Sequence, residues 1–278
     1  MPDYIYESRA VAFLDVLGFK EKLDEFEAEA IGIFERERNG EVGNDEIYQA
    51  LISPKANSFI DAFMGAISGL DPNKFKYYLF SDNICITVND AKNRELLREL
   101  LLVICELYFA FAKNGYFLRG AIDYGYFINQ ETLALGKPLA RAYGLEQKEA
   151  IYPRVLISEK FKEVFVDFAI ETGEHRFNES LILQSCEKIY LNIFIYVLKT
   201  DNKLEFLTLM HDAIIQNLEL NNRSEHVFIK YEWLAKEFNH FLNFYLTKLV
   251  YEDVTAEPSP EFLHDLELLK ILNHGIED

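Results

Sequence analysis

Two aspartates each stand at the end of an apolar segment that has the composition of a β-strand. Asp15 lies within Phe13-Leu-Asp-Val-Leu-Gly-Phe19, and Asp82 follows Tyr77-Tyr-Leu-Phe-Ser81. A carboxylate in such a setting is costly to bury without a partner. Two carboxylates on neighbouring strand ends supply the oxygen ligands that hard divalent cations prefer, and such cations often accompany a nucleoside triphosphate. The pair therefore predicts a metal-dependent nucleotide enzyme.

A simple turn is the competing interpretation. Ser81-Asp82-Asn83 has typical turn chemistry, in which an aspartate accepts backbone N–H groups. For Asp82 alone, the turn explains the residue as well as a metal does. Asp15 stands between Leu14 and Val16 and is harder to explain in this way, so the two aspartates together favour metal binding.

Apolar periodicity predicts the elements that position these aspartates. Alternation of period two predicts a strand over 9–17, in which Phe13 and Asp15 share a face, and a hairpin over 75–88. The chain order β-α-α-ββ-α-β-α-β is typical of a ferredoxin-like palm, an antiparallel sheet with helices on one face, in the α+β class. The remaining elements are helices over 20–38, 58–68, 94–113, 138–149 and 159–169, and strands over 116–128 and 154–158.

In the C-terminal part, the apolar pattern predicts a further hairpin over 180–199 and helices from 204 onward. Because no Pro-rich or Gly-rich linker separates it from the rest, we expect it to pack on the same body. The predicted organisation is a palm over residues 1–170 and a hairpin and helical extension over 171–278. The apolar stripe from Phe228 to Leu249 is expected to be core or dimer contact.

The amino-acid composition limits the kinds of partner that this protein is expected to bind. The 278 residues include 46 acidic and 28 basic side chains, for a net charge of −18, so neither nucleic acid nor an anionic membrane is expected to bind. No apolar run reaches membrane-spanning length and no basic leader opens the chain, which favours the cytoplasm. The three cysteines and six histidines show no metal-type spacing, so a zinc site is not expected.

Four segments, in order, resemble the motifs of class III nucleotidyl cyclases. Phe13-Leu-Asp15-Val-Leu-Gly18-Phe19 is similar to the first metal motif of that family, and Leu79-Phe-Ser-Asp82 is similar to the second. Leu118-Arg-Gly-Ala-Ile-Asp-Tyr-Gly125 resembles the strand that follows, and Gly136-Lys-Pro-Leu-Ala-Arg-Ala-Tyr-Gly-Leu-Glu146 has the length and end residues of the family's helix motif. The resemblance covers residues 9–158.

The resemblance implies a two-metal site. Asp15, Asp82 and the backbone carbonyl of Val16 would hold two Mg²⁺ or Mn²⁺ ions, and a nucleotide 3′-hydroxyl would attack its own α-phosphorus with loss of pyrophosphate. The site would be shared across a homodimer, with metals from one protomer and an arginine from the other. The phosphates would lie at a helix start, on the N–H groups of Leu17, Gly18 and Phe19.

The base-reading positions depart from the adenylate cyclases. Those enzymes carry a lysine four residues before the second metal aspartate, where this chain has Tyr78, and the partner aspartate falls on Leu133. A tyrosine hydroxyl donates or accepts, and the ring fills space that a purine would need. The pattern resembles the pyrimidine cyclases of bacterial Pycsar anti-phage systems, which make cyclic UMP or cyclic CMP as a signal for a separate effector protein. UTP and CTP are equally open as substrates, and a purine cyclase stays an alternative if another residue replaces the lysine.

The helix motif departs as well. The family's asparagine and arginine fall on Ala140 and Gly144. Arg119 and Arg141 are candidate catalytic substitutes, since a guanidinium grips phosphate bidentately. The plainer alternatives are that Arg119 pairs with Asp123 and that Arg141 is solvated.

Two other functions are alternatives to the cyclase. If neither arginine serves, the chain would be a cyclase-like nucleotide sensor without turnover. A polymerase-type palm making linear or cyclic oligonucleotides is disfavoured by the acidic composition and by the lack of a Gly-Gly-Asp-Glu-Phe signature.

Overall fold

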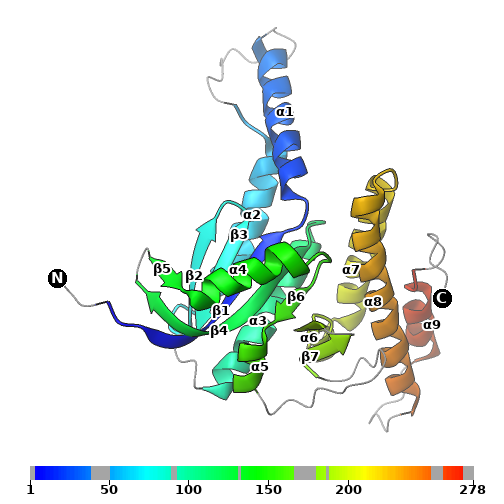
Figure 1. The fold of residues 1–278 in the computed structure, drawn as a ribbon. Coiled ribbons are helices and arrows are strands. Elements are labelled where there is room, and N and C mark those ends of the chain that lie inside the picture. The colour runs from blue at the N-terminus through cyan, green and yellow to red at the C-terminus, as the bar shows by residue number, and fades with distance from the viewer. Residues whose placement is uncertain are drawn as a thin grey trace.

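One mixed β-sheet carries both aspartates (Figure 1). The computed structural model describes residues 4–38, 51–88, 93–130, 133–165, 180–185, 188–251 and 259–271. The strands are β1 (Glu7–Val16), β2 (Phe75–Phe80), β3 (Asn83–Val88), β4 (Leu118–Asn129), β5 (Ala134–Gly136), β6 (Val155–Ile157), β7 (Ile182–Ser185) and β8 (Lys188–Leu191). The sheet order is β2-β3-β1-β4-β6-β8-β7, with β5 on β4. The α+β class predicted from the sequence is confirmed.

β1 is the central strand, and its alternation separates two faces. It pairs antiparallel with β3 and with β4, so that Asp15 lies opposite Asn83 on one side and Arg119 on the other. Even-numbered residues such as Leu14 enter the main core, whereas Phe13 belongs to a smaller cluster on the other face. Phe13 and Asp15 therefore share the face that the period-two pattern predicted.

The main core lies between the sheet and the helices α1 (Phe19–Arg38), α2 (Pro54–Ser68) and α3 (Arg94–Ala112). The expected amphipathic stripe of α3 is buried along its length, and Asn93 caps its start by accepting N–H groups of the first turn. α2 begins four residues before the predicted start. The reason is Ser53, whose hydroxyl accepts the Ala56 N–H at 3.1 Å and so forms an N-cap.

α4 (Lys137–Glu149) lies against the opposite face of the sheet, in front of it in Figure 1. Tyr143 packs edge-on against Phe13 with 5.4 Å between ring centroids, and Ala142 joins the same small cluster. The crossover through α4 lets β4 and β6 run parallel, with Gly120 opposite Val155. This pair departs from the antiparallel arrangement expected for the palm.

The predicted hairpin over 180–199 is wrong in its last part, because its second strand ends early. β8 ends at Leu191, and α6 (Ile195–Lys199) follows. Asn192 is buried at the break, where its side chain donates to the Ser180 carbonyl at 3.0 Å and its backbone N–H to the Leu181 carbonyl. An apolar run this short does not distinguish a buried strand from a buried helix. The helix predicted over 159–169 is α5 (Glu159–Val164), and its last residues lie outside the described part.

The C-terminal helices α7 (Lys203–Leu220), α8 (Glu225–Tyr251) and α9 (Pro260–Leu268) lie side by side next to the sheet (Figure 1). Their apolar stripe is core, since Leu234, Phe238 and Phe241 are buried. α8 also contacts the sheet body, where Trp233 stacks on Tyr152 with 5.1 Å between centroids. In the described part of the chain, no helix has the length and apolarity needed to cross a membrane.

Candidate functional site

The turn between β1 and α1 sets Asp15 at the end of the central strand. Gly18 adopts a φ of +73°, a left-handed conformation that favours glycine, and α1 begins at the next residue. The Leu17 N–H donates to the Phe117 carbonyl at 2.8 Å, because the β1–β4 pairing continues into the turn. The Leu17 N–H is therefore already hydrogen-bonded. Of the three N–H groups predicted to bind phosphate, those of Gly18 and Phe19 are the remaining candidates.

Asp82 lies at the tip of the hairpin between β2 and β3. Only Ser81 and Asp82 separate the paired residues Phe80 and Asn83. Ser81 has a φ of +59°, which costs a non-glycine residue on the order of 1 kcal/mol. The Asn83 side-chain amide donates to Asp82 Oδ1 at 3.2 Å. The Asp82 carboxyl nevertheless also hydrogen-bonds the Asp15 carboxyl, so this turn brings the two predicted metal ligands together.

Arg119 is the third residue at the corner of the sheet where Asp15 and Asp82 meet. Its Nε donates to Asp15 Oδ2 at 2.8 Å, and its Nη2 reaches the same oxygen at 2.8 Å and Glu146 Oε1 at 2.9 Å. Glu146 of α4 is fully buried and accepts from the Gln147 side chain at 2.6 Å. The predicted alternative that Arg119 pairs with Asp123 is wrong, because Asp123 lies four residues further along β4 and has other partners.

Burial and nearby charges shift the pKa values of the acids at this corner. Burial raises the pKa of Asp15 to about 7, and the Arg119 guanidinium opposes this shift. The nearby Glu146 carboxylate raises the pKa of Asp15 further, and so does the hydrogen bond that protonated Asp15 donates to Asp82. Burial also raises the pKa of Glu146. Asp15 and Glu146 share Arg119, and Asp82 is near both of these acids, so the corner carries a surplus of negative charge that a cation would neutralise.

The donor set fits a hard divalent cation in part. Asp15 and Asp82 supply two carboxyl groups within hydrogen-bonding distance of each other, a separation that one cation can bridge. Among the residues that the structure describes, no cluster of three His, Cys, Asp or Glu side chains is arranged to hold a metal. Two carboxylates with water and substrate phosphates are the usual coordination of Mg²⁺. The predicted metal role of the Val16 carbonyl stays a prediction.

Arg141 lies apart from this corner. Its guanidinium pairs with Asp123, which is fully buried, and donates to the Tyr124 carbonyl at 2.9 Å. Ser158 donates to the same Asp123 at 2.6 Å. Since Asp123 stands four residues from Arg119 along β4, about 13 Å separate the two positions. The structure therefore brings Asp15, Asp82 and Arg119 together and leaves Arg141 elsewhere in the same protomer.

Tyr78 is buried on the same face of the sheet as Phe13. Its hydroxyl lies 2.6 Å from the Gln130 carbonyl oxygen and 3.3 Å from the Leu133 carbonyl oxygen, and it also contacts the Asn129 side chain. The two positions that the resemblance assigns to base recognition, Tyr78 and Leu133, are thus in contact. In this protomer the hydroxyl is engaged by the loop between β4 and β5.

Glu146 is the residue whose place in this site the sequence did not predict. It was identified only as the last residue of the helix motif. Its part in the site depends on Arg119, which approaches it from a different element. The signal that identifies Glu146 is its burial opposite an arginine on a strand, and this can be recognised only in the folded structure.

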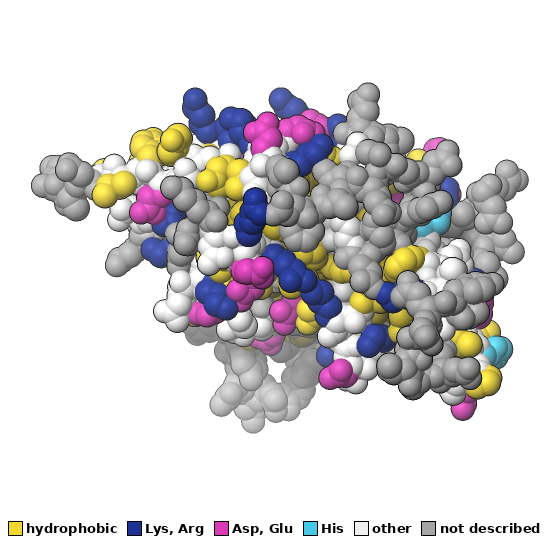
Figure 2. All heavy atoms as spheres, turned by 90° about the horizontal axis from the view of Figure 1, so that it is seen from below, with side chains coloured by type: hydrophobic (Ala, Val, Ile, Leu, Met, Phe, Trp, Pro, Cys, Tyr) yellow, Lys and Arg dark blue, Asp and Glu magenta, His cyan; other side chains and the backbone are white. Residues whose placement is uncertain are grey.

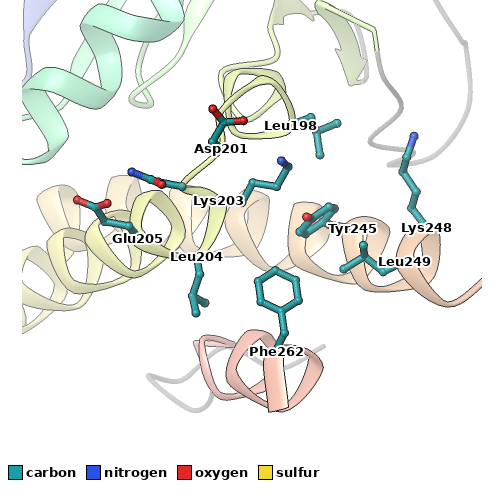
Figure 3. Close-up of a pocket in the computed structure, with 10 residues that line it drawn as sticks. Leu198, Asp201, Lys203, Leu204, Glu205, Tyr245, Lys248, Leu249 and Phe262 are labelled. Atoms are coloured by element: carbon teal, nitrogen blue, oxygen red, sulfur yellow. The ribbon is translucent and has the colours of Figure 1, made fainter. Parts of the chain in front are cut away.

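Two cavities lie outside this corner. One, of about 790 Å³, lies between α6, α7, α8 and α9 and is lined by both charged and apolar side chains (Figure 3). The other, of about 1080 Å³, lies beside β4 and the start of α4 and includes Ala140 and Arg141. Neither is lined by Asp15 or Asp82. On the face seen in Figure 2, basic and acidic side chains are interspersed among apolar ones.

No family model matches the chain, and no curated protein matches it. Solved structures with a similar shape include a bacterial light-regulated adenylyl cyclase, at 12% identity and a TM-score of 0.40, covering 75% of this chain and 99% of that one. Another is the monomeric guanylyl cyclase domain of a RhoGC fusion protein from the aquatic fungus Blastocladiella emersonii, at 14% identity and a TM-score of 0.38, covering 66% and 94%. Likeness this slight assigns no function.

Proposed function

We propose that this chain is a nucleotidyl cyclase that converts UTP or CTP to the 3′,5′-cyclic monophosphate and pyrophosphate. The observation that carries the proposal is the contact between Asp15 and Asp82 at adjacent strand ends, with Arg119 beside them. Asp15 and Asp82 stand at the two metal positions that the class III resemblance assigns. The preference for a pyrimidine rests on Tyr78 at the base position.

In this reaction the 3′-hydroxyl oxygen forms a bond to the α-phosphorus, the bond from that phosphorus to the bridging oxygen breaks, and pyrophosphate leaves with the electron pair. Asp15 and Asp82 would hold the divalent cation, Mg²⁺ or Mn²⁺, two per site by resemblance. When bound, the cation supplies acidification of the hydroxyl and neutralisation of phosphate charge.

The chain's own residues supply position and charge. The N–H groups of Gly18 and Phe19 stand at the start of α1, where a helix favours anionic groups. Arg119 is held in place by Asp15 and Glu146, so its guanidinium keeps a defined position next to the bound phosphates. Most of the rate acceleration would come from such preorganised charge and from orientation of the hydroxyl.

The second catalytic arginine would come from another copy. Because Arg141 is held at Asp123, away from Asp15, its predicted role needs a homodimer in which it approaches the partner's site. The role of the cyclic nucleotide as an anti-phage signal, read by a separate effector protein, stays a prediction from the resemblance.

The test is incubation of the purified protein with Mn²⁺ and each of the four ribonucleoside triphosphates separately, with products identified by mass. We expect cyclic UMP or cyclic CMP from the wild type and none from Asp82→Ala. The matched control is Asp24→Ala, which removes an exposed acid from α1. Cyclic product from Asp82→Ala would overturn the metal assignment, and cyclic AMP or cyclic GMP as the main product would overturn the pyrimidine preference.

A nucleotide sensor without turnover is the second candidate. The observation that favours it is on α4, where Ala140 and Gly144 stand at the family's asparagine and arginine positions. The point where a Cβ on Gly144 would be has open space around it. Triphosphate binding without product from any of the four nucleotides would support this function over the cyclase.

A further inference from the structure

The Arg119 guanidinium contacts its two acids unequally. Its Nε donates a hydrogen bond to Asp15 Oδ2 at 2.8 Å, and its Nη2 lies 2.8 Å from the same oxygen. Nη2 also lies 2.9 Å from Glu146 Oε1, which is an ion-pair distance. Among the residues that the structure describes, no group donates a hydrogen bond to this glutamate oxygen. The guanidinium is therefore aligned with Asp15 and only close to Glu146.

The contact of Glu146 with Arg119 is incomplete for a buried acid. The Glu146 side chain is fully buried, and its second oxygen accepts from the Gln147 side chain at 2.6 Å. Buried carboxylate oxygens usually accept at least one hydrogen bond, and an oxygen left without one costs free energy. Glu146 would therefore gain a hydrogen bond if the Arg119 guanidinium turned toward it.

The pair of Arg141 and Asp123 provides a comparison within the same protein. Asp123 also lies on β4 and is fully buried. One of its oxygens accepts from Arg141 Nε, and the other accepts from the Ser158 hydroxyl at 2.6 Å. Both oxygens of this buried acid are hydrogen-bonded. The contact between Arg119 and Glu146 lacks this completeness, which indicates that Asp15 draws the guanidinium away from Glu146.

Asp15 is also the predicted cation ligand. A guanidinium and a divalent cation on the same buried carboxylate would repel each other, because both are positive and little water separates them. The Arg119 side chain is 23% exposed, so it is not enclosed on every side. Its Nη2 already lies within ion-pair distance of Glu146, so a turn of this one side chain would exchange the two acids.

We propose that Glu146 is the positioning residue of Arg119. When a divalent cation binds Asp15, the guanidinium leaves Asp15, stays paired with Glu146 and presents its other N–H groups to the substrate phosphates. An arginine suits this exchange because its planar fork spans two acceptors, which a lysine ammonium does not reproduce. The proposal deepens the proposed cyclase function and rests on it, since it takes Asp15 to be a cation ligand.

The test is a double-mutant cycle in which Mn²⁺ is titrated calorimetrically into the full-length protein without nucleotide. We expect Glu146→Gln to weaken Mn²⁺ binding about tenfold, because Arg119 then has Asp15 as its remaining acid partner and competes with the ion. In the Arg119→Met background, the same substitution should change the affinity by less than about threefold. The matched control is Glu149→Gln, which removes a negative charge from the same helix at a residue paired with Lys188.

A second measurement keeps the test open if Arg119→Met does not fold, which circular dichroism shows. The Nε–H group of Arg119 gives an NMR signal that is identified by its loss in Arg119→Lys. Because this group donates to Asp15, its signal should shift when Mg²⁺ is added to the wild type. A signal that is unchanged at saturating Mg²⁺ would show that the guanidinium stays on Asp15, and this would overturn the proposal.

Equal effects of Glu146→Gln in the two backgrounds would show that Glu146 attracts the ion directly, which also overturns the proposal. A wild type that binds no Mn²⁺ would overturn both the proposal and the metal assignment. If the cycle shows coupling but no triphosphate yields a cyclic product, the cyclase function fails while the exchange of acids stands. If product forms without coupling, the cyclase function stands and Glu146 has a structural role only.

Discussion

Asp15 and Arg119 lie directly opposite each other on β1 and β4, and their side chains form an ion pair at 2.8 Å although 104 residues separate them in the chain. The same guanidinium reaches Glu146 on α4. One cation therefore joins the central strand, its neighbour and the helix above them. The corner that holds the predicted metal ligands is also a point on which the packing of α4 depends.

Replacing Arg119 by methionine should destabilise the protein by about 3–5 kcal/mol, because Glu146 would be left buried without its charge partner. Urea denaturation measures the change in the free energy of unfolding. The matched control is Lys74→Met, which breaks the exposed pair with Glu99 and should cost less than about 1 kcal/mol. If Arg119→Met lowers the free energy of unfolding no more than Lys74→Met does, Arg119 does not stabilise the buried Glu146 as we infer.

Divalent-cation affinity should rise with pH through neutrality. The pKa of Asp15 is raised to about 7, mainly by burial, so at pH 6 a proton competes with the cation for this carboxylate. Below pH 7, affinity should fall by up to about tenfold per pH unit. Calorimetric titration with Mn²⁺ at pH 6, 7 and 8 checks this. Equal affinity at all three values would show that Asp15 is not a ligand or that its pKa is not raised.

Glu237 on α8 should make stability depend on pH. Burial raises its pKa to about 7, although the Tyr190 hydroxyl, 3.1 Å away, and Arg154 oppose the shift. The unfolded value is near 4.5, so between these values the folded state holds the extra proton. Stability therefore falls as pH rises from about 4.5 to about 7, by on the order of 3 kcal/mol.

The substitution Glu237→Gln should remove that fall, and the variant should be more stable than wild type above pH 7. Chemical denaturation at pH 5 and pH 8 provides the comparison, with the exposed Glu219→Gln as control. An unchanged pH slope in Glu237→Gln would show that another group titrates.

Two glycines should respond to alanine in opposite directions. A Cβ on Gly120 would lie 2.2 Å from the Phe13 carbonyl oxygen, which is part of the central strand, so Gly120→Ala should cost at least about 3 kcal/mol. Gly144 has open space around it inside α4, and Gly144→Ala should stabilise the protein by about 1 kcal/mol. Thermal and urea denaturation of the two variants test this. Equal effects would contradict the close approach of β4 to β1.

Tyr78 should control the choice of base. The resemblance assigns its position to base recognition, and the ring occupies space beside Leu133 that a purine would need. Tyr78→Ala should lower the ratio of kcat/KM for UTP or CTP to that for ATP by about tenfold. The exposed Tyr77→Ala, its neighbour on β2, is the control. A ratio unchanged in Tyr78→Ala would place base selection elsewhere.

Local patterns were sufficient to predict much of the fold. The face shared by Phe13 and Asp15, the hairpin turn at Asp82 and the buried stripe of α3 follow from side-chain periodicity and turn chemistry, which act over a few residues. The same local rules failed at 192–199, where a short apolar run fits either a strand or a helix and the side chain of Asn192 decides the outcome.

By itself, the sequence of this protein determined that two aspartates would end two strands, because alternation and turn residues are local properties. Only the tertiary structure decided which charges meet. Arg119 pairs with Asp15 and Glu146 instead of Asp123, and Arg141 is the partner of Asp123. These contacts join residues separated by many positions, so they depend on strand register and on how α4 packs, which no local pattern encodes.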